Sequence, residues 1–232
     1  MQNLTENNRI YLSGGGNEKQ SFLLDKFFFR AFPKNGRFLY VPIALRGHEL
    51  YRTASVWMKG ILALHGRTDI EFETVDDPSE YTFDDLEKFN RIYIGGGNTW
   101  SLIQELRDSG FADILIQCIE AGGQVYGGSA GAIIMGKRID THDDENEMNF
   151  QDISGFNLLS DFSVACHFKK YEQNDRFRAW AINNDLPIMC LPEETGLIIE
   201  KGVALCVGTQ PCVIYFADGT RKDINPQDSF NL

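Results

Sequence analysis

The sequence predicts an α/β protein built on a doubly wound, mostly parallel sheet, with helices on both faces and hairpins at its C-terminal end. Three observations predict this fold. Through the first two thirds of the 232 residues, short apolar runs alternate with longer amphipathic segments, as strands and helices do in βα units. Short glycine-containing turns connect several of these runs to the segments that follow. The last third instead has apolar runs separated or followed by turn signals, Lys201-Gly202 and Asp218-Gly219, which indicates hairpins.

The elements of the first two thirds follow from this alternation. Short apolar runs bounded by turn residues predict strands at residues 9–13, 37–41, 70–75, 91–94 and 124–126. Apolar residues at helical spacing predict helices at residues 18–32, 50–64, 82–89, 98–107 and 112–121, and a further helix that starts near Ser129. Because the connections are short, we expect the strands to be parallel and covered on both faces.

The last third is expected to hold mostly strands. The predicted strands are residues 162–166, 187–191, 197–200, 204–207 and 213–216, with a short helix at 175–182. The acidic segment 141–149 is expected to lie on the surface. No linker, repeat or low-complexity segment divides the chain, so we expect one domain over residues 1–232.

Composition and charge exclude several classes of protein. Apolar residues make up 43% of the chain and charged residues 24%, which excludes a disordered chain. The 22 lysines and arginines against 33 aspartates and glutamates give a net charge of −11, which disfavours nucleic acid as a partner. No apolar run reaches the roughly 18 residues of a membrane span, and residues 1–9 carry no secretory signal. We therefore expect a cytoplasmic protein without a membrane partner.

Cysteine and histidine usage gives no sign of a metal site. The number of cysteines is five, and none form a C-x-x-C pair, so they are expected to be buried thiols in a reducing compartment. The four histidines are not spaced as metal ligands. We expect no bound metal and no cofactor.

The sharpest local signal is Gly127-Gly-Ser-Ala-Gly131, which fits G-x-S-x-G between a predicted strand and a predicted helix. Such a turn strains the backbone of its central residue and lifts the Ser129 hydroxyl above the sheet. The amide N–H of Ala130 would then point at the oxyanion of a tetrahedral intermediate. The alternative interpretation is a turn of small residues that only permits close packing.

A serine nucleophile needs a base and an acid that orients it. Two histidines follow Ser129. His142 lies in the acidic segment and is expected to be exposed, whereas His167 ends an apolar run and is the better candidate. Glu193 and Glu194 follow the run at 187–191, at the strand edge where sites form in doubly wound sheets. The sequence pattern does not distinguish which of the two glutamates would orient the histidine.

Two glycine triplets, Ser13-Gly-Gly-Gly-Asn17 and Ile94-Gly-Gly-Gly-Asn98, each follow a predicted strand. Neither fits the G-x-G-x-x-G pattern of dinucleotide binding. Beside a nucleophile turn, a glycine triplet can supply the second oxyanion donor from its backbone. The alternative is a tight connection between strand and helix.

Four segments in chain order resemble the peptidase E family of serine peptidases (family S51), which includes aspartyl dipeptidases and, more distantly, cyanophycinases. The segments are Gly95-Gly-Gly-Asn-Thr99, Gly128-Ser-Ala-Gly-Ala132, Cys166-His-Phe168 and Leu191-Pro-Glu-Glu-Thr195. The resemblance spans nearly the whole chain. It implies a flavodoxin-like fold similar to that of class I glutamine amidotransferases, with serine in place of cysteine at the elbow.

The resemblance also implies roles for single residues. Ser129 would be the nucleophile, His167 the base and Glu193 the acid, since the family's glutamate directly follows the Leu-Pro pair. The backbone N–H groups of Gly97 and Ala130 would form the oxyanion hole. The order Ser, His, Glu also differs from the Ser, acid, His order of α/β-hydrolases.

One departure concerns the substrate. Aspartyl dipeptidases carry an arginine beyond the catalytic histidine that binds the aspartate of the substrate, and here Gln173 stands at the matching position. The candidate substrate-binding residues are therefore Asn98, Gln173 and Arg176.

The expected function is hydrolysis of small peptides, with acidic or isoaspartyl-type residues at the cleaved bond as candidate substrates. One alternative is a ligand-binding member without activity, which predicts a misaligned triad or a pocket filled by side chains. Another is an acyl hydrolase or esterase with the same triad. The oligomeric state stays open, and a homo-oligomer is among the states allowed.

Overall fold

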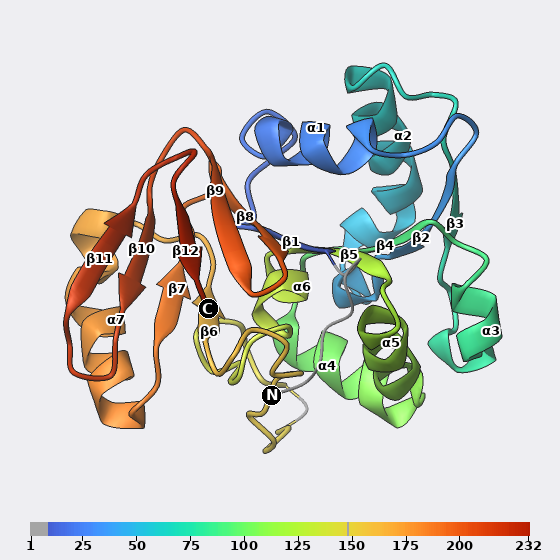
Figure 1. Cartoon of the computed structure of the whole chain (residues 1–232). Coiled ribbons are helices and arrows are strands. Elements are labelled where there is room, and N and C mark those ends of the chain that lie inside the picture. The colour runs from blue at the N-terminus through green and yellow to red at the C-terminus, as the bar shows by residue number, and fades with distance from the viewer. Residues whose placement is uncertain (1–8, 148) are drawn as a thin grey trace.

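The computed structural model in Figure 1 describes residues 9–147 and 149–232. Residues 1–8, which belong to the N-terminal segment where no secretory signal was expected, lie outside the described residues. Met148 of the acidic segment lies outside them as well.

The larger sheet has eight strands in the order β12-β9-β8-β1-β5-β4-β2-β3. From β1 to β3 in this order, neighbouring strands are parallel, whereas β8, β9 and β12 join by antiparallel pairing. The bounds are β1 Arg9–Ser13, β2 Arg37–Val41, β3 Glu71–Thr74, β4 Arg91–Ile94, β5 Gln124–Gly128, β8 Thr195–Glu200, β9 Val203–Gly208 and β12 Ser229–Asn231. The predicted α/β class with a mostly parallel sheet is confirmed.

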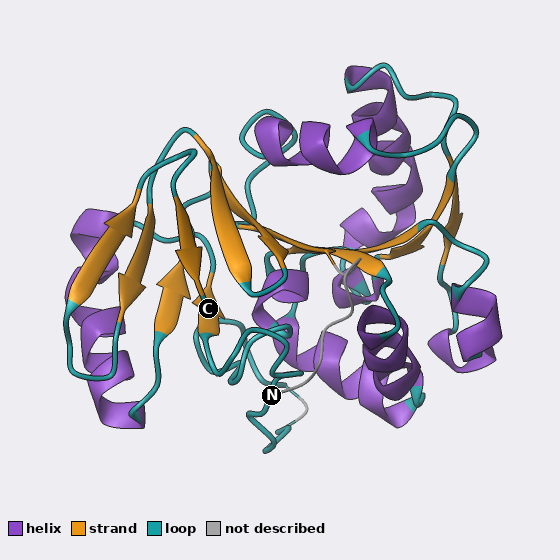
Figure 2. Ribbon diagram, in the orientation of Figure 1, coloured by secondary structure: helices purple, strands orange, loops and turns teal. Residues whose placement is uncertain are grey.

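Helices cover both faces of this sheet (Figures 1 and 2). Alternate strand residues point to opposite faces. Tyr11 and Tyr126 therefore pack with α1 and α2, whereas Leu12 and Val125 pack with α4 and α5. The helix bounds are α1 Phe22–Arg30, α2 Ala54–Leu64, α3 Phe83–Leu86, α4 Thr99–Asp108, α5 Phe111–Glu120 and α6 Ala130–Ile133, with short 3₁₀ turns at Ile43–Leu45, Glu49–Thr53 and Pro78–Glu80.

A second sheet of four strands, in the order β11-β10-β7-β6, lies beside the first (Figure 1). Its pairing is antiparallel except between β6 and β7. Helix α7 covers it, and Phe177 and Ala181 of that helix pack on Cys190 and Tyr215. The bounds are β6 Ser163–Ala165, α7 Lys170–Asn184, β7 Ile188–Cys190, β10 Cys212–Tyr215 and β11 Arg221–Ile224.

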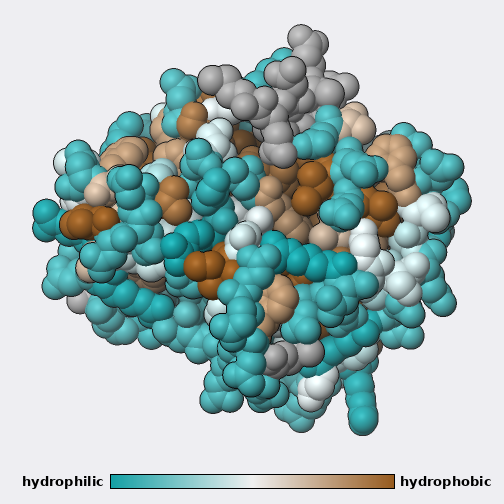
Figure 3. All heavy atoms as spheres, turned by 90° about the horizontal axis from the view of Figure 1, so that it is seen from below, coloured by the Kyte–Doolittle hydropathy of each residue, from teal (hydrophilic) through white to brown (hydrophobic). Residues whose placement is uncertain are grey.

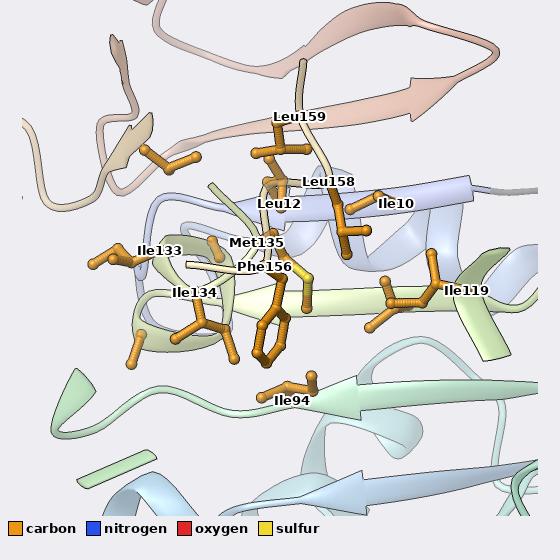
Figure 4. Close-up of a cluster of buried hydrophobic side chains, with 14 of the residues drawn as sticks. Ile10, Leu12, Ile94, Ile119, Ile133, Ile134, Met135, Phe156, Leu158 and Leu159 are labelled. Atoms are coloured by element: carbon orange, nitrogen blue, oxygen red, sulfur yellow. The ribbon is translucent and has the colours of Figure 1, made fainter. Parts of the chain in front are cut away.

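Beneath the ends of β1 and β5, buried side chains from distant segments form the core that supports the site. Figure 4 shows Phe156, Leu158 and Leu159, from the irregular segment before β6, beside Leu12 of β1 and Met135, which follows α6. These five residues are at most 6% exposed. The position of α6 is therefore determined by packing below it as well as by the turn before it.

Four elements differ clearly from the prediction: helices α1 and α7 and strands β11 and β12. Helix α1 starts at Phe22, because Asn17 Oδ1 accepts hydrogen bonds from Lys19 N and Gln20 N and holds a turn there. Helix α7 starts at Lys170, five residues before the predicted position, with the Gln173 side chain accepting from Lys169 N. The strands β11 and β12 follow the last predicted strand and were not predicted, because Arg221–Ile224 and Ser229–Asn231 are mainly polar and exposed.

All five cysteines are buried and free, which confirms their predicted burial. In the described residues, no cluster of histidine, cysteine and carboxylate side chains has the geometry of a metal site. Within the same ranges, no helix has both the length and the apolar composition needed to cross a membrane. The face of the molecule seen in Figure 3 is mainly hydrophilic, with small separate hydrophobic patches.

Candidate active site

Ser129 lies at the carboxyl edge of the larger sheet, between the last residue of β5 and the first residue of α6. Its backbone has φ 49° and ψ −109°, a conformation that a non-glycine residue adopts only under constraint. The constraint is visible in the backbone, because Ser129 N donates to Ser13 O at 3.2 Å and Ser129 O accepts from Ala132 N at 2.8 Å. The strand therefore passes into the helix without a loop, as the pentapeptide predicted.

His167 follows β6 at the junction of the two sheets. Its backbone N–H donates to Gly14 O at 2.8 Å, which attaches the end of β6 to the end of β1. The φ of His167 is 54°, again in the left-handed region. Its Nε2 lies 2.8 Å from Ser129 Oγ, within hydrogen-bond distance.

Glu193 lies between β7 and β8, and its Oε1 is 2.9 Å from His167 Nδ1. Glu194, the alternative, makes no hydrogen bond with His167 in the described residues and accepts instead from Gln20 and Gln210. The bond with His167 is the largest influence on Glu193, and it holds the pKa of this carboxyl below its usual range against partial burial. A continuous chain of hydrogen bonds thus joins Ser129, His167 and Glu193.

Gln20 is a member of this site that the sequence analysis did not identify. Its amide nitrogen donates to Glu193 Oε2 at 2.7 Å and to Glu194 Oε1 at 3.2 Å. It thereby fixes the oxygen of Glu193 that does not contact His167. Gln20 falls inside the predicted helix 18–32, and the pattern offered no signal to distinguish it from a solvent-facing helix residue.

The two glycine triplets have different roles. A Cβ on Gly15 would lie 2.5 Å from two atoms of the His167 ring and 2.8 Å from Ser129 Cβ, so this position admits only glycine. The first triplet is thus the surface against which Ser129 and His167 pack. In the second triplet, Gly97 has φ 140°, and a Cβ there would lie 2.1 Å from Ala44 O.

The predicted oxyanion donors have unused N–H groups. In the described part of the chain, no backbone hydrogen bond is donated by Gly97 N. Ala130 is the first residue of α6, so its N–H has no partner inside the helix. Ala130 follows Ser129 directly in the chain, and Gly97 and Ser129 line the same two cavities.

Cys166 and His142 lie near Ser129, but neither is placed to act as nucleophile or base. Burial raises the pKa of the Cys166 thiol, which donates weakly to Ser13 O and Ser129 O. His142 was predicted to be exposed, and this is wrong, because its side chain is only 7% exposed. It packs edge-on against Trp100, while Asp144 N donates to its Nδ1 at 3.0 Å.

Two cavities meet at Ser129 and His167. One, of about 430 Å³, lies on the side of α1 and α2 and is lined largely by apolar and aromatic side chains such as Trp57 and Tyr93. The other, of about 340 Å³, is polar and includes Arg176. A substrate carbonyl at the Ser129 hydroxyl would therefore have room on both sides.

The candidate substrate-binding residues are only partly brought together. Gln173 and Arg176 both line the polar cavity, and Arg176 Nη1 is paired with Asp143 at 2.5 Å. Asn98 is not among the residues lining the described cavities. Its side chain accepts from Ser101 N and caps α4, while its amide nitrogen donates to Glu145 O.

Comparison with known proteins identifies the family of the chain. A family model described as "Peptidase family S51" matches residues 9–207. The chain belongs to peptidase family S51. Like the other members of that family, it is a peptidase.

Relatives and a solved structure extend the match over nearly the whole chain. Peptidase E of Streptomyces coelicolor is 25% identical over 226 residues, which cover 93% of this chain and 85% of that protein. A Drosophila melanogaster protein named "Probable alpha-aspartyl dipeptidase" is 26% identical over 206 residues, 81% of this chain and 79% of its own. The crystal structure of a peptidase from an acI-B1 actinobacterium superposes with a TM-score of 0.72 at 19% identity, covering 97% of each chain, and shows the same fold.

Proposed function

We propose that this S51 peptidase is a serine-type enzyme that hydrolyses small peptides through an acyl-enzyme intermediate. The observation that carries the proposal is the chain of hydrogen bonds from Ser129 Oγ to His167 Nε2, 2.8 Å, and from His167 Nδ1 to Glu193 Oε1, 2.9 Å. Nucleophile, base and orienting acid are within reach of one another without any rearrangement.

In the proposed mechanism, Ser129 Oγ attacks the substrate carbonyl while His167 Nε2 takes its proton. The Glu193 carboxylate stabilises the imidazolium that forms and holds its tautomer. The N–H groups of Gly97 and Ala130 bind the oxyanion, each contributing about 10²–10³ in rate. His167 then gives the proton to the leaving amine. Water, activated by the same imidazole, releases the acyl group from Ser129.

The substrates we propose are small peptides with an acidic or isoaspartyl-type residue on the acyl side of the cleaved bond. Arg176, in the polar cavity beside Ser129, supports this assignment, because a guanidinium has five N–H donors and can hold a substrate carboxylate in addition to Asp143. The name of the Drosophila relative points to the same class of substrate.

The test is the variant Ser129→Ala. We expect hydrolysis of a panel of Asp-X and isoAsp-X dipeptides to fall by at least about 10⁴-fold, because the nucleophile is lost. We expect the unfolding transition in urea to stay within about 1 kcal/mol of the wild type, since the change removes one partly exposed hydroxyl. Hydrolysis that persists in this variant would refute the proposal.

Labelling with a fluorophosphonate separates this proposal from its alternatives. We expect Ser129 to be labelled in the wild type and not in His167→Ala. A ligand-binding protein without activity would leave Ser129 unlabelled in both. An esterase would be labelled but would cleave ester substrates and leave the peptide panel intact.

A further inference from the structure

We propose that the cavity lined by Trp57, Tyr93 and Tyr126 binds an apolar side chain, aromatic by preference, on the leaving-group side of the cleaved bond. We call it the aromatic cavity. The inference rests on the proposed function, because the leaving-group side is defined by attack from Ser129. It specifies the second residue of the substrate, which neither the sequence nor the names of the relatives specify.

Of the three rings that define the aromatic cavity, Trp57 is the most accessible, because it is 38% exposed whereas Tyr93 and Tyr126 are 4% and 1% exposed. The rings of Tyr93 and Tyr126 are stacked with centroids 4.2 Å apart, and the Trp57 ring meets Tyr93 edge-on at 6.4 Å. Leu45 and Leu50 lie on the same cavity. Aromatic rings favour stacked or edge-on contact with one another, so a phenyl or indole group gains more here than an aliphatic group of equal area.

The aromatic cavity has no charge to match a charged side chain. Apart from His167, the described residues that line it include no acidic or basic side chain. Burying a charge without a partner is costly, so a lysine, arginine, aspartate or glutamate on the leaving residue is disfavoured.

Two hydroxyl groups of the cavity lining, those of Tyr126 and Ser21, already donate hydrogen bonds. Tyr126 donates to Asp25 Oδ1 at 2.6 Å, and Ser21 donates to Asp25 Oδ2 at 2.7 Å. Asp25 itself is only 1% exposed. An apolar group that enters the cavity therefore leaves none of these polar groups unpaired, and the usual penalty for covering polar atoms does not arise.

The contents of the two cavities indicate which side of the cleaved peptide bond each of them would hold. A carbonyl carbon held at Ser129 Oγ has an acyl substituent, a leaving group and an oxygen, and the oxygen points to Gly97 N and Ala130 N. The polar cavity contains Arg176 and takes the acidic acyl residue. The aromatic cavity, which also reaches Ser129 and His167, is then left for the leaving residue.

The rim of the aromatic cavity exposes apolar side chains to water. Trp57 is 38% exposed and Leu50 is 52% exposed. A bound phenyl group would cover part of both, and apolar surface removed from water contributes about 25 cal/mol per Å². Val56, on the same helix as Trp57, is 69% exposed and does not line the cavity, so it serves as a matched control.

The experiment compares hydrolysis of Asp-Ala and Asp-Phe. In the wild type we expect kcat/KM for Asp-Phe to exceed that for Asp-Ala by about 10- to 100-fold, the ratio that burial of one large apolar side chain gives. In Trp57→Ala, and in Leu50→Ala as a second variant, we expect this ratio to fall at least about fivefold. In Val56→Ala it should stay within about twofold. A ratio near one in the wild type, or a ratio unchanged in both cavity variants, would overturn the proposal.

Failure of the proposed function has a different signature. If neither peptide is hydrolysed by the wild type, calorimetry with the intact Ser129→Ala protein tests whether the aromatic cavity still binds Asp-Phe more tightly than Asp-Ala. Tighter binding of Asp-Phe than of Asp-Ala, lost when Trp57→Ala is added, supports the aromatic cavity even without catalysis. Equal binding of the two peptides, or a preference that survives Trp57→Ala, argues against it.

Discussion

Ser129 and His167 both have backbone φ angles in the left-handed region, 49° and 54°, although neither is glycine. Such conformations cost roughly 1–3 kcal/mol each and persist only where the surroundings impose them. Here the surroundings are the ends of β1, since Ser13 O accepts from Ser129 N and Gly14 O accepts from His167 N. One strand end therefore positions both groups, and the 2.8 Å contact between their side chains follows from it.

At the same scale, the two adjacent glutamates provide a matched pair of variants. We expect Glu193→Gln to lower kcat/KM by about 10²–10⁴-fold, because the amide cannot hold the required tautomer of His167 or stabilise its charge. We expect Glu194→Gln to stay within about threefold, since Glu194 contacts Gln20 and Gln210 instead. Steady-state kinetics on one dipeptide measures both. Equal losses in the two variants would contradict the assignment of the acid.

The lowered pKa of Glu193 predicts how the charge of this carboxylate depends on pH. The hydrogen bond with His167 lowers this pKa in the folded protein, so the carboxylate stays ionised further into acid than a free glutamate. The stability that the ionised carboxylate contributes to the folded protein is present at neutral pH. It is lost only as the pH falls through the lowered pKa. Because its side chain is 41% exposed, the contribution to global stability is small.

At the scale of elements, a buried carboxylate joins α1 to the strand that precedes the nucleophile. Asp25 of α1 accepts from the Tyr126 hydroxyl of β5, three residues before Ser129. Burial raises the pKa of Asp25 to about 6, against the two hydroxyl hydrogen bonds that lower it. The contact thus connects a helix that covers the sheet to the strand that leads into the turn at Ser129.

This contact predicts a pH-dependent stability with a definite sign. Because the pKa of Asp25 is raised above its unfolded value of about 3.8, protonation favours the folded state. Its contribution to the free energy of unfolding is fully present below about pH 4 and is lost as pH rises through about 6. In urea denaturation, we expect the wild type to lose up to about 1.4 kcal/mol per pH unit relative to Asp25→Asn across this window.

The control for Asp25 is Asp113→Asn, a change to an exposed aspartate of α5. This variant removes an exposed carboxylate and leaves the hydrogen bonds of Tyr126 and Ser21 to Asp25 in place. If the stability of the wild type relative to Asp25→Asn stays constant with pH, or increases as the pH rises, Asp25 does not titrate as inferred.

At the scale of the whole molecule, the three catalytic candidates come from two sheets. Ser129 follows β5 of the larger sheet, His167 follows β6 of the smaller one, and Glu193 lies where the chain passes from β7 to β8. The site exists only while the two sheets keep their relative position. The bond from His167 N to Gly14 O, 2.8 Å, crosses this junction. Leu191, which is 0% exposed, belongs to the same buried cluster as Leu12 of β1.

We therefore expect activity and structure to be lost together in urea. Peptide hydrolysis, far-UV circular dichroism and tryptophan fluorescence should give the same transition midpoint, as in two-state unfolding of one domain. The coincidence also tests the predicted single domain of residues 1–232. Loss of hydrolysis at clearly lower urea than loss of circular dichroism would mean that the sheets separate first and that the chain behaves as two units.

The local sequence pattern was sufficient to predict much of the fold and the main candidate catalytic residues. Strand and helix periodicity predicted β1, β2 and β4 at their observed bounds, and the pentapeptide around Ser129 predicted the strained turn between β5 and α6. The apolar run before it favoured His167 over His142, and the resemblance to the family then singled out Glu193. In the structure, His167 lies within hydrogen-bond distance of both Ser129 and Glu193.

The remaining features depend on contacts between residues far apart in the chain, which a local pattern does not contain. Gln20 reaches Glu193 across 173 positions, and His142 is buried because Trp100 packs on it. Asn98, a candidate for substrate binding, instead caps its own helix. The sequence by itself determined the order of strands and helices and the types of residue available for catalysis, because both follow from local chemistry. The tertiary structure alone decided which side chains meet and which walls surround Ser129, because burial and distance are set only when the sheets pack.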